Sequence, residues 1–171
     1  MNFGSLHRLV KSPLVLMAAG LVGVVAVACT SGVSAAPSFT GETFHHGTFN
    51  LDEQKGKPVV INFWFPSCPP CVAEMPDLQE AYEKYGPQGV EFVGVQQLGL
   101  DTPQDGIEFL EERGVTFPAF PDTGSQVQGS YEILSFPTTV FLNRDHSINR
   151  TWTGLIGKDH LEEQVEEILN S

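Results

Sequence analysis

A nearly continuous apolar run over residues 59–65 constrains the fold of this chain more than any other feature. Apolar residues at successive positions of a strand face both sides of a sheet, which is typical of a central strand covered on both faces. A helical pattern follows over about 68–85, and a second buried strand is predicted at 90–96. This alternation predicts an α/β protein with a mixed central sheet and helices on both faces.

Turn residues complete the predicted order of elements. Gly86 is expected to end the first helix, and Pro76 is expected to kink it because proline removes one backbone hydrogen bond. Residues 39–51 are rich in Phe and Thr and contain turn glycines, so they predict an N-terminal β-hairpin. Thr102 precedes a proline and an early acidic residue, which marks a helix start. The remaining predictions are helices at 103–113, 125–131 and 158–170 and strands at 117–120, 138–143 and 147–153.

The first 30 residues have the pattern of an export segment. Arg8 and Lys11 precede an uncharged run over 13–28, which is as long as a signal-peptide core. It is shorter than the ~20 residues that span a bilayer. Cys29 follows small residues in a pattern that resembles a bacterial lipobox, so Cys29 is the predicted lipidation site. Soluble export with cleavage after Ala35 and an uncleaved anchor are the alternatives.

Each of these alternatives places the domain on the extracytoplasmic side of the cell envelope. Disulfides persist there, and thiols need a dedicated electron supply. The expected organisation is an export segment at 1–30, a small and polar tether at 31–38, and a single domain at 39–171.

Charge narrows the choice of partners. Beyond residue 36 the chain holds 7 basic and 21 acidic residues, a formal charge of −14. Such an acidic surface repels phosphate backbones, which excludes nucleic acid as a default partner.

Two cysteines lie where the predicted central strand meets the first helix. Backbone N–H groups at a helix N-terminus stabilise a thiolate on the first of them, Cys68. Cys71 lies one turn further along, close enough to attack a mixed disulfide. Cys68 is therefore the predicted nucleophile and Cys71 the resolving thiol, while Pro69 and Pro70 remove two backbone donors and restrict the turn.

A structural disulfide or half of a zinc site would use the same pair of cysteines. A zinc site needs about four ligands, and no second paired cysteine is present. We therefore expect no metal, and no cofactor beyond a redox-active disulfide between Cys68 and Cys71. The other prominent polar groups are expected to be solvated, namely His45, His46 and the helix acids Glu162, Glu163, Glu166 and Glu167.

The strand at 59–64, the cysteine pair, the Glu74-Met75-Pro76 that follows it and the segment 136–142 together resemble the thioredoxin superfamily. More closely, they are similar to the exported TlpA/ResA/CcmG-type thiol–disulfide oxidoreductases. The likeness covers roughly residue 39 to the C-terminus, and it implies a thioredoxin fold.

The resemblance also implies site residues. Pro137 is expected to be a cis-proline that faces the cysteine pair and exposes the Phe136 backbone to an incoming peptide. Pro69 and Pro70 would border the same substrate site. Glu74 matches an acidic position of ResA-like members, where a partly buried carboxylate takes or gives the proton of the resolving cysteine.

Two positions depart from the family pattern. Asn62 stands where most thioredoxins carry a buried Asp, so Glu74 would have to accept the proton. Ser67 replaces the usual Trp before the first cysteine, so less aromatic surface is expected beside Cys68. Trp64 and Phe109 are predicted to be packing residues.

The predicted function is reduction of disulfides in envelope proteins by dithiol–disulfide exchange. The resemblance implies apocytochrome c or copper-site proteins as substrates, a membrane thiol-reducing electron donor, and a domain tethered to the membrane through its N-terminus. A peroxide-reducing redoxin is one alternative, although such enzymes carry Thr or Ser where this chain has Phe65. A thioredoxin-fold metal-delivery protein is another, although such proteins usually space their cysteines by three residues.

Overall fold

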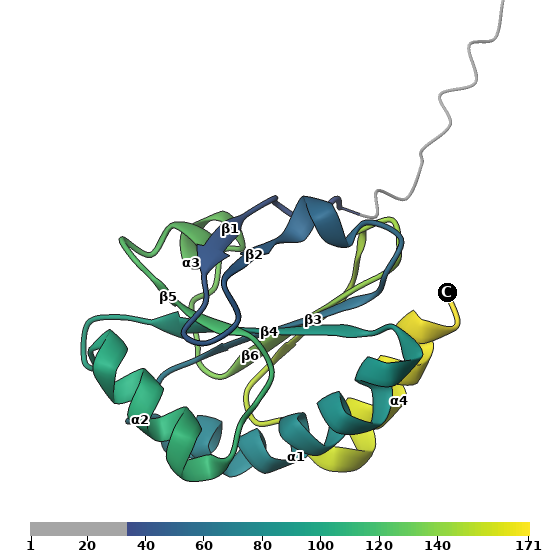
Figure 1. Ribbon diagram of the computed structural model, residues 1–171. Coiled ribbons are helices and arrows are strands. Elements are labelled where there is room, and N and C mark those ends of the chain that lie inside the picture. The colour runs from purple at the N-terminus through teal and green to yellow at the C-terminus, as the bar shows by residue number, and fades with distance from the viewer. Residues whose placement is uncertain (1–33) are drawn as a thin grey trace, which may run out of the picture. The chain divides into compact units, whose positions relative to one another are not determined.

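A five-stranded mixed sheet forms the centre of the computed structural model, which describes residues 34–171 (Figure 1). Its strand order is β5-β4-β3-β6-β7. Strand β3 pairs in parallel with β4 and antiparallel with β6, as the predicted mixed sheet requires. The strands are β3 (Val59–Trp64), β4 (Glu91–Gln97), β5 (Ala119–Asp122), β6 (Thr138–Leu142) and β7 (Ile148–Thr153).

Helices cover both faces of the sheet, but unequally. Three long helices lie on one face: α1 (Pro69–Tyr85), α2 (Pro103–Arg113) and α4 (Lys158–Leu169) (Figure 1). The other face carries the short α3 (Gln126–Ser130) and the hairpin of β1 (Thr40–Glu42) and β2 (Thr48–Asn50), followed by a 3₁₀ turn, η1 (Leu51–Gln54). The predicted N-terminal hairpin is thus confirmed. Together with α3 it covers the apolar core on this face of the sheet.

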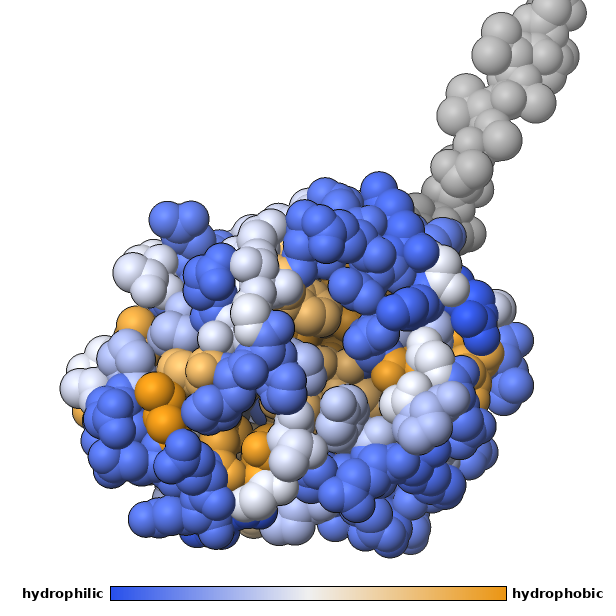
Figure 2. All heavy atoms as spheres, viewed as in Figure 1, coloured by the Kyte–Doolittle hydropathy of each residue, from blue (hydrophilic) through white to orange (hydrophobic). Residues whose placement is uncertain are grey.

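Strand β3 supplies both cores, which explains its continuous apolar run. All six of its residues are buried. Val60 and Trp64 join the core beneath the three long helices, whereas Ile61 and Phe63 join the core beneath the hairpin and α3. Viewed from the same side as Figure 1, the surface is mostly hydrophilic, and most of the apolar atoms in view lie in hollows between polar side chains (Figure 2).

Both ends of α1 lie where the sequence predicted them. Cys68 is the N-cap, and the helix is continuous through Pro76. It ends at Tyr85, but Gly86 keeps a helical backbone with φ −54° and opens a 3₁₀ turn, η2 (Gly86–Gln88). The helix therefore ends where predicted, with Gly86 as its C-cap, and the left-handed residue that follows is Gly89, with φ 95°.

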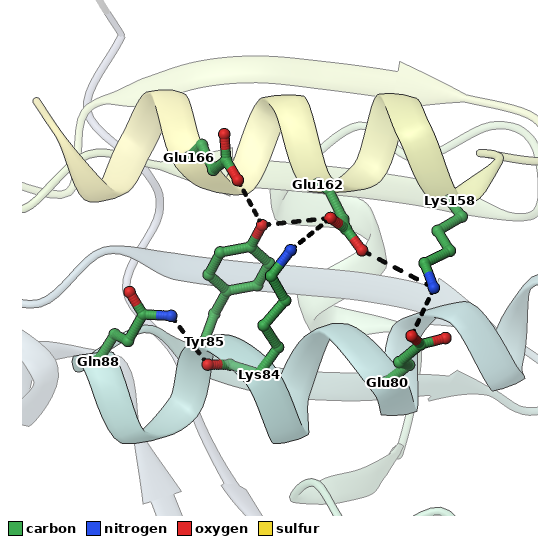
Figure 3. Close-up of polar contacts among 7 residues, drawn as sticks. All are labelled: Glu80, Lys84, Tyr85, Gln88, Lys158, Glu162 and Glu166. Carbon is green, nitrogen blue, oxygen red and sulfur yellow. Dashed lines mark hydrogen bonds and ion pairs between the residues drawn. The ribbon is translucent and has the colours of Figure 1, made fainter.

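Helix α4 packs along α1 through a row of polar contacts (Figure 3). The Tyr85 hydroxyl donates to Glu166 at 2.7 Å, and Lys84 Nζ lies 2.5 Å from Glu162. Lys158 at the start of α4 pairs with Glu80 of α1. The sequence predicted Glu162 and Glu166 to lie on a solvated face of α4 that serves solubility alone, and that prediction is wrong because both side chains also cross-link the two helices.

The first described residues bind the edge of the sheet. The Ala36 N–H donates to the His146 carbonyl at 2.9 Å, and the Ile148 N–H donates to the Ser34 carbonyl at 2.9 Å. The part of the predicted tether that begins at residue 34 is therefore bonded to the turn between β6 and β7. Within residues 34–171, no helix combines the length and the apolar character that crossing a membrane requires.

Candidate active site

The two cysteines form a disulfide at the N-terminus of α1. The Cys71 N–H donates to the Cys68 sulfur at 3.2 Å, and Pro69 and Pro70 occupy the first helical positions, where a missing N–H costs nothing. Cys68 is 3% exposed and Cys71 is 0% exposed. Both cysteines are therefore buried, and only Cys68 keeps any exposed surface.

A contact that the sequence did not reveal holds the turn before Cys68. Asp101, in the loop between β4 and α2, accepts hydrogen bonds from the Ser67 N–H at 3.2 Å and from the Ser67 hydroxyl at 2.7 Å. The two residues are 34 positions apart. The small polar residue that replaces the family's Trp thus fastens the active-site turn to a neighbouring loop.

The segment before β6 forms the opposite wall of the site. The Phe136-Pro137 peptide bond is cis, as the resemblance implied, and the Pro137 carbonyl accepts from the Gly154 N–H at 2.8 Å. The Phe136 ring packs edge-on against Phe65, with centroids 5.4 Å apart. Phe65 and Phe136 therefore supply an aromatic contact on the strand side of Cys68, where the missing Trp led us to expect less aromatic surface.

Glu74 lies one turn after Cys71 on the same face of α1, and it is more deeply buried than expected, with 1% of its surface exposed. Its Oε1 accepts from Asn62 Nδ2 at 2.8 Å, and its Oε2 accepts from the Ile156 N–H at 3.0 Å. Burial raises the pKa of Glu74 to about 7, while the two hydrogen bonds oppose that rise. The side chain therefore exchanges a proton near neutral pH.

Asn62 makes the site sensitive to that proton. Its Nδ2 donates to Glu74 and, at 3.0 Å, to the Thr139 hydroxyl, whereas its Oδ1 is buried without a partner. This orientation suits an ionised Glu74, which only accepts. A protonated Glu74 donates instead, and a flip of the Asn62 amide would present Oδ1 to receive that hydrogen bond.

The residues assigned to packing do pack. Trp64 is 0% exposed and lies against Phe109, with ring centroids 5.1 Å apart. His45 and His46 are exposed in the hairpin turn, as expected.

Across residues 34–171, no three His, Cys, Asp or Glu side chains are grouped so that they would hold a metal ion.

These features define a class of protein before any comparison is made. A thioredoxin fold, a disulfide that caps a helix, a cis-proline segment and a buried titratable carboxylate together form a dithiol–disulfide exchange centre.

Comparison with known proteins agrees with this class. Residues 33–151 match the AhpC/TSA family. The thiol-disulfide oxidoreductase ResA of Oceanobacillus iheyensis is 36% identical over 138 residues, which cover 78% of this chain and 71% of that protein. The ResA of Geobacillus kaustophilus is 34% identical and covers 79% of this chain and 76% of that protein.

Solved structures show the same relationship. A secreted Mycobacterium tuberculosis disulfide oxidoreductase homologous to DsbE superposes with a TM-score of 0.68 at 26% identity, covering 75% of this chain and 95% of that chain. StoA from Bacillus subtilis gives 0.67 at 27% identity, with 75% and 96% covered. The chain belongs to the AhpC/TSA family, among the thiol–disulfide oxidoreductases of the ResA and DsbE type.

The structure thus brings Cys68, Cys71, Glu74 and the Phe136-Pro137 bond to one end of the sheet. Sequence reasoning missed Asp101 and the Ile156 N–H. No local pattern marks either one, because each acts through a contact with a residue that is distant in the chain. Cys29, the predicted lipidation site, lies outside the described residues.

Proposed function

We propose that this protein is an extracytoplasmic reductase of disulfides in envelope proteins. One observation carries the proposal: the disulfide between Cys68 and Cys71 caps α1 while a carboxylate with a pKa of about 7 lies buried one helical turn away. A merely structural disulfide has no use for a buried proton acceptor.

In the first step, the reduced protein attacks a substrate disulfide through the Cys68 thiolate. One substrate sulfur becomes bonded to Cys68, and the other leaves as a thiolate. The α1 N-terminus stabilises the attacking thiolate, because the Cys71 N–H points at the Cys68 sulfur. The Phe136 backbone and the two prolines after Cys68 would border the bound peptide.

In the second step, Cys71 resolves the mixed disulfide. Its thiol loses a proton to Glu74, and the resulting thiolate attacks the Cys68 sulfur. The protein disulfide forms, and the second substrate sulfur leaves as a thiolate. Two electrons have then passed from the protein to the substrate, and a membrane thiol-reducing donor must return them.

The location and the direction of electron flow rest on different arguments. The N-terminal pattern and the likeness to a secreted disulfide oxidoreductase support an extracytoplasmic domain, tethered through lipidated Cys29. The reducing direction follows from the resemblance to ResA-type proteins, and with it apocytochrome c or copper-site proteins as substrates. A reduction potential near that of thioredoxin (~−270 mV) is expected, whereas one near that of DsbA (~−120 mV) would reverse the direction.

Trapping tests the proposal directly. The Cys71→Ser protein, expressed in full length in its own cell envelope, should accumulate mixed disulfides through Cys68, and mass spectrometry would identify the partners. Cytochrome precursors, copper-site proteins or a membrane thiol reductase would each place the protein in a different pathway. The Cys68→Ser, Cys71→Ser double variant is the control and should trap nothing.

Two measurements on the purified protein separate the alternatives. Rapid turnover of hydrogen peroxide would support a peroxide reductase in place of a protein-disulfide reductase. Stoichiometric copper binding that survives a competing chelator would support metal delivery. The proposal expects neither result, and it expects insulin reduction that depends on Cys68.

A further inference from the structure

Only one backbone donor of the active-site turn reaches the Cys68 sulfur. Free N–H groups at a helix N-terminus stabilise a thiolate on the cysteine that caps the helix. Here the Cys71 N–H points at the Cys68 sulfur, at 3.2 Å. Pro69 and Pro70, which come between the two cysteines, have no N–H to donate.

The other donors of this turn are engaged elsewhere. The Cys68 N–H donates to the Phe65 carbonyl at 3.2 Å, and the Val72 N–H donates to the Cys68 carbonyl at 3.0 Å. The Ser67 N–H donates to Asp101 at 3.2 Å. A Cys68 thiolate would therefore have one backbone hydrogen bond at a residue that is 3% exposed, and burial with so few donors disfavours the charged form.

Asp101 brings a negative charge to the same turn. Both hydrogen bonds that it accepts come from Ser67, the residue before Cys68. Within residues 34–171, no basic side chain forms an ion pair with this carboxylate. A negative charge held against the neighbouring residue opposes a second negative charge on the Cys68 sulfur.

The segments around the dithiol carry no positive charge that would offset Asp101. Each of them contacts the dithiol turn, the cis bond or Glu74, and they are residues 65–71, 98–102, 132–137 and 154–157. None of them contains lysine, arginine or histidine. Besides the cysteines, their titratable side chains are Asp101 and Glu132, and Glu74 lies one turn after Cys71. All of these are acids, so none favours a negative charge on Cys68.

We propose that Asp101 is a positioning residue that acts through Ser67 and disfavours the Cys68 thiolate, which makes the dithiol a better electron donor. A stabilised thiolate stabilises the reduced protein and makes such a centre an oxidant, as in DsbA, so a destabilised thiolate has the opposite effect. This inference rests on the proposed exchange reaction at Cys68. It assigns to one side chain a part of the reducing direction that the resemblance alone suggested.

Equilibration of the full-length protein with glutathione tests the proposal. Two glutathione thiols give two electrons to the protein disulfide, so one glutathione disulfide and one protein dithiol form. Asp101→Asn is the informative variant, because the amide oxygen can still accept from Ser67 while the charge is removed.

The expected effect depends on pH. At about pH 9.5, where thiolates are populated, Asp101→Asn should shift the equilibrium constant about tenfold towards the dithiol, which raises the reduction potential by about 30 mV. At about pH 5.5 both thiols are protonated, so the charge has no thiolate to act on and the two proteins should agree. Ultraviolet absorbance of the thiolate in the reduced proteins should show that Asp101→Asn ionises first, by about one pH unit.

Three further variants separate charge from fastening of the turn. Asp101→Glu retains the charge and should ionise much as the wild type does. Ser67→Ala removes one hydrogen bond and keeps the carboxylate, so its shift should be smaller than that of Asp101→Asn. Glu112→Gln removes an equal charge from an exposed position on α2 and should match the wild type at both pH values. Should Asp101→Asn melt well below the wild type, Asp101→Ser, which is also neutral, replaces it.

The outcomes distinguish this inference from the proposed function. Equal thiolate titrations of the wild type and Asp101→Asn would overturn the role of Asp101. A shift of the same size at both pH values, or a larger shift in Ser67→Ala, would also overturn it, because the contact would then only fasten the turn. If the wild-type disulfide does not exchange with glutathione at either pH, the proposed function is wrong instead.

Discussion

The two ends of α1 hold acidic side chains in opposite ways. Near its N-terminus, Glu74 is buried and is met only by neutral donors, so its pKa rises to about 7. At its C-terminal end, Glu162 of α4 is half-exposed beside Lys84, and the hydrogen bond from Lys84 lowers the pKa of Glu162 (Figure 3). The second arrangement stabilises the helix pair, whereas the first keeps a carboxylate in a state that is unfavourable for folding and suited to proton transfer.

The largest difference between the two ends should appear in activity. Cys68→Ser should reduce insulin-disulfide reduction to the uncatalysed rate, because no other described sulfur is accessible. Lys84→Met at the far end of α1 should leave turnover unchanged. Residual activity in Cys68→Ser above the uncatalysed rate would show that the nucleophile is misassigned.

The second largest difference should appear in the pH dependence of stability, which Glu74 should affect and the exposed acids at the other end of α1 should not. Glu74 has a folded-state pKa of about 7 against an ordinary value of 4.5, so the folded protein binds this proton more tightly than the unfolded chain does. Stability that is fully present below pH 4.5 is therefore lost as the pH rises to about 7. The loss is roughly 3 kcal/mol, an order-of-magnitude figure.

Denaturant titrations of the oxidised protein at several pH values measure this effect. Glu74→Gln should remove the loss, so that the difference in unfolding free energy between wild type and variant changes across this pH range. Parallel curves for the two proteins would mean that Glu74 titrates at its ordinary pKa.

A carboxylate introduced beside Glu74 should raise the pKa of Glu74 still further above that of the exposed acids. Asn62→Asp would place a carboxylate within hydrogen-bonding distance of Glu74, and the like charge should raise the pKa of Glu74 by about one unit or more. Release of the substrate thiol in single-turnover experiments should then require a higher pH. Asn149→Asp on β7 is the matched control and should leave the pH profile of thiol release unchanged. If the profile of Asn62→Asp is also unshifted, Glu74 is not the group that accepts the Cys71 proton.

The smallest effect is expected at the α1–α4 contact. Glu162→Gln should cost about 0.5 kcal/mol, because partly exposed ion pairs are screened by solvent. The loss should shrink in high salt, where charges interact over shorter distances. Denaturation at low and high ionic strength measures it, and a salt-independent loss would point to packing in place of charge.

Sequence patterns predicted the parts of this molecule that depend on neighbours in the chain. The buried strand β3, the start of α2 at Thr102 and the position of the dithiol at the tip of α1 all follow from local spacing. The cis bond at Pro137 came from the resemblance alone, because no local rule distinguishes it from an ordinary strand-opening proline.

What the sequence left open depends on contacts across the fold. The buried Glu74 carboxylate is satisfied in part by the Ile156 N–H, 82 residues away, which no local pattern reveals. Glu162 faces Lys84 across 78 residues, so its role is invisible in the pattern of α4 alone. Gly86 ends α1 as predicted, but with a helical backbone, because Pro87 suits an early position of the 3₁₀ turn that follows and the left-handed residue is Gly89.

Two backbone hydrogen bonds attach residues 34–36 to the turn between β6 and β7, so the first described residues lie at a defined end of the sheet. Leu142, at the end of β6, pairs with Val59, where β3 begins, whereas Cys68 follows the other end of β3. The chain therefore enters the domain at one pole of the sheet and presents its reactive sulfur at the opposite pole. The proposed N-terminal tether would therefore attach on the side of the sheet opposite the dithiol, and the direction of the strands places Cys68 away from it.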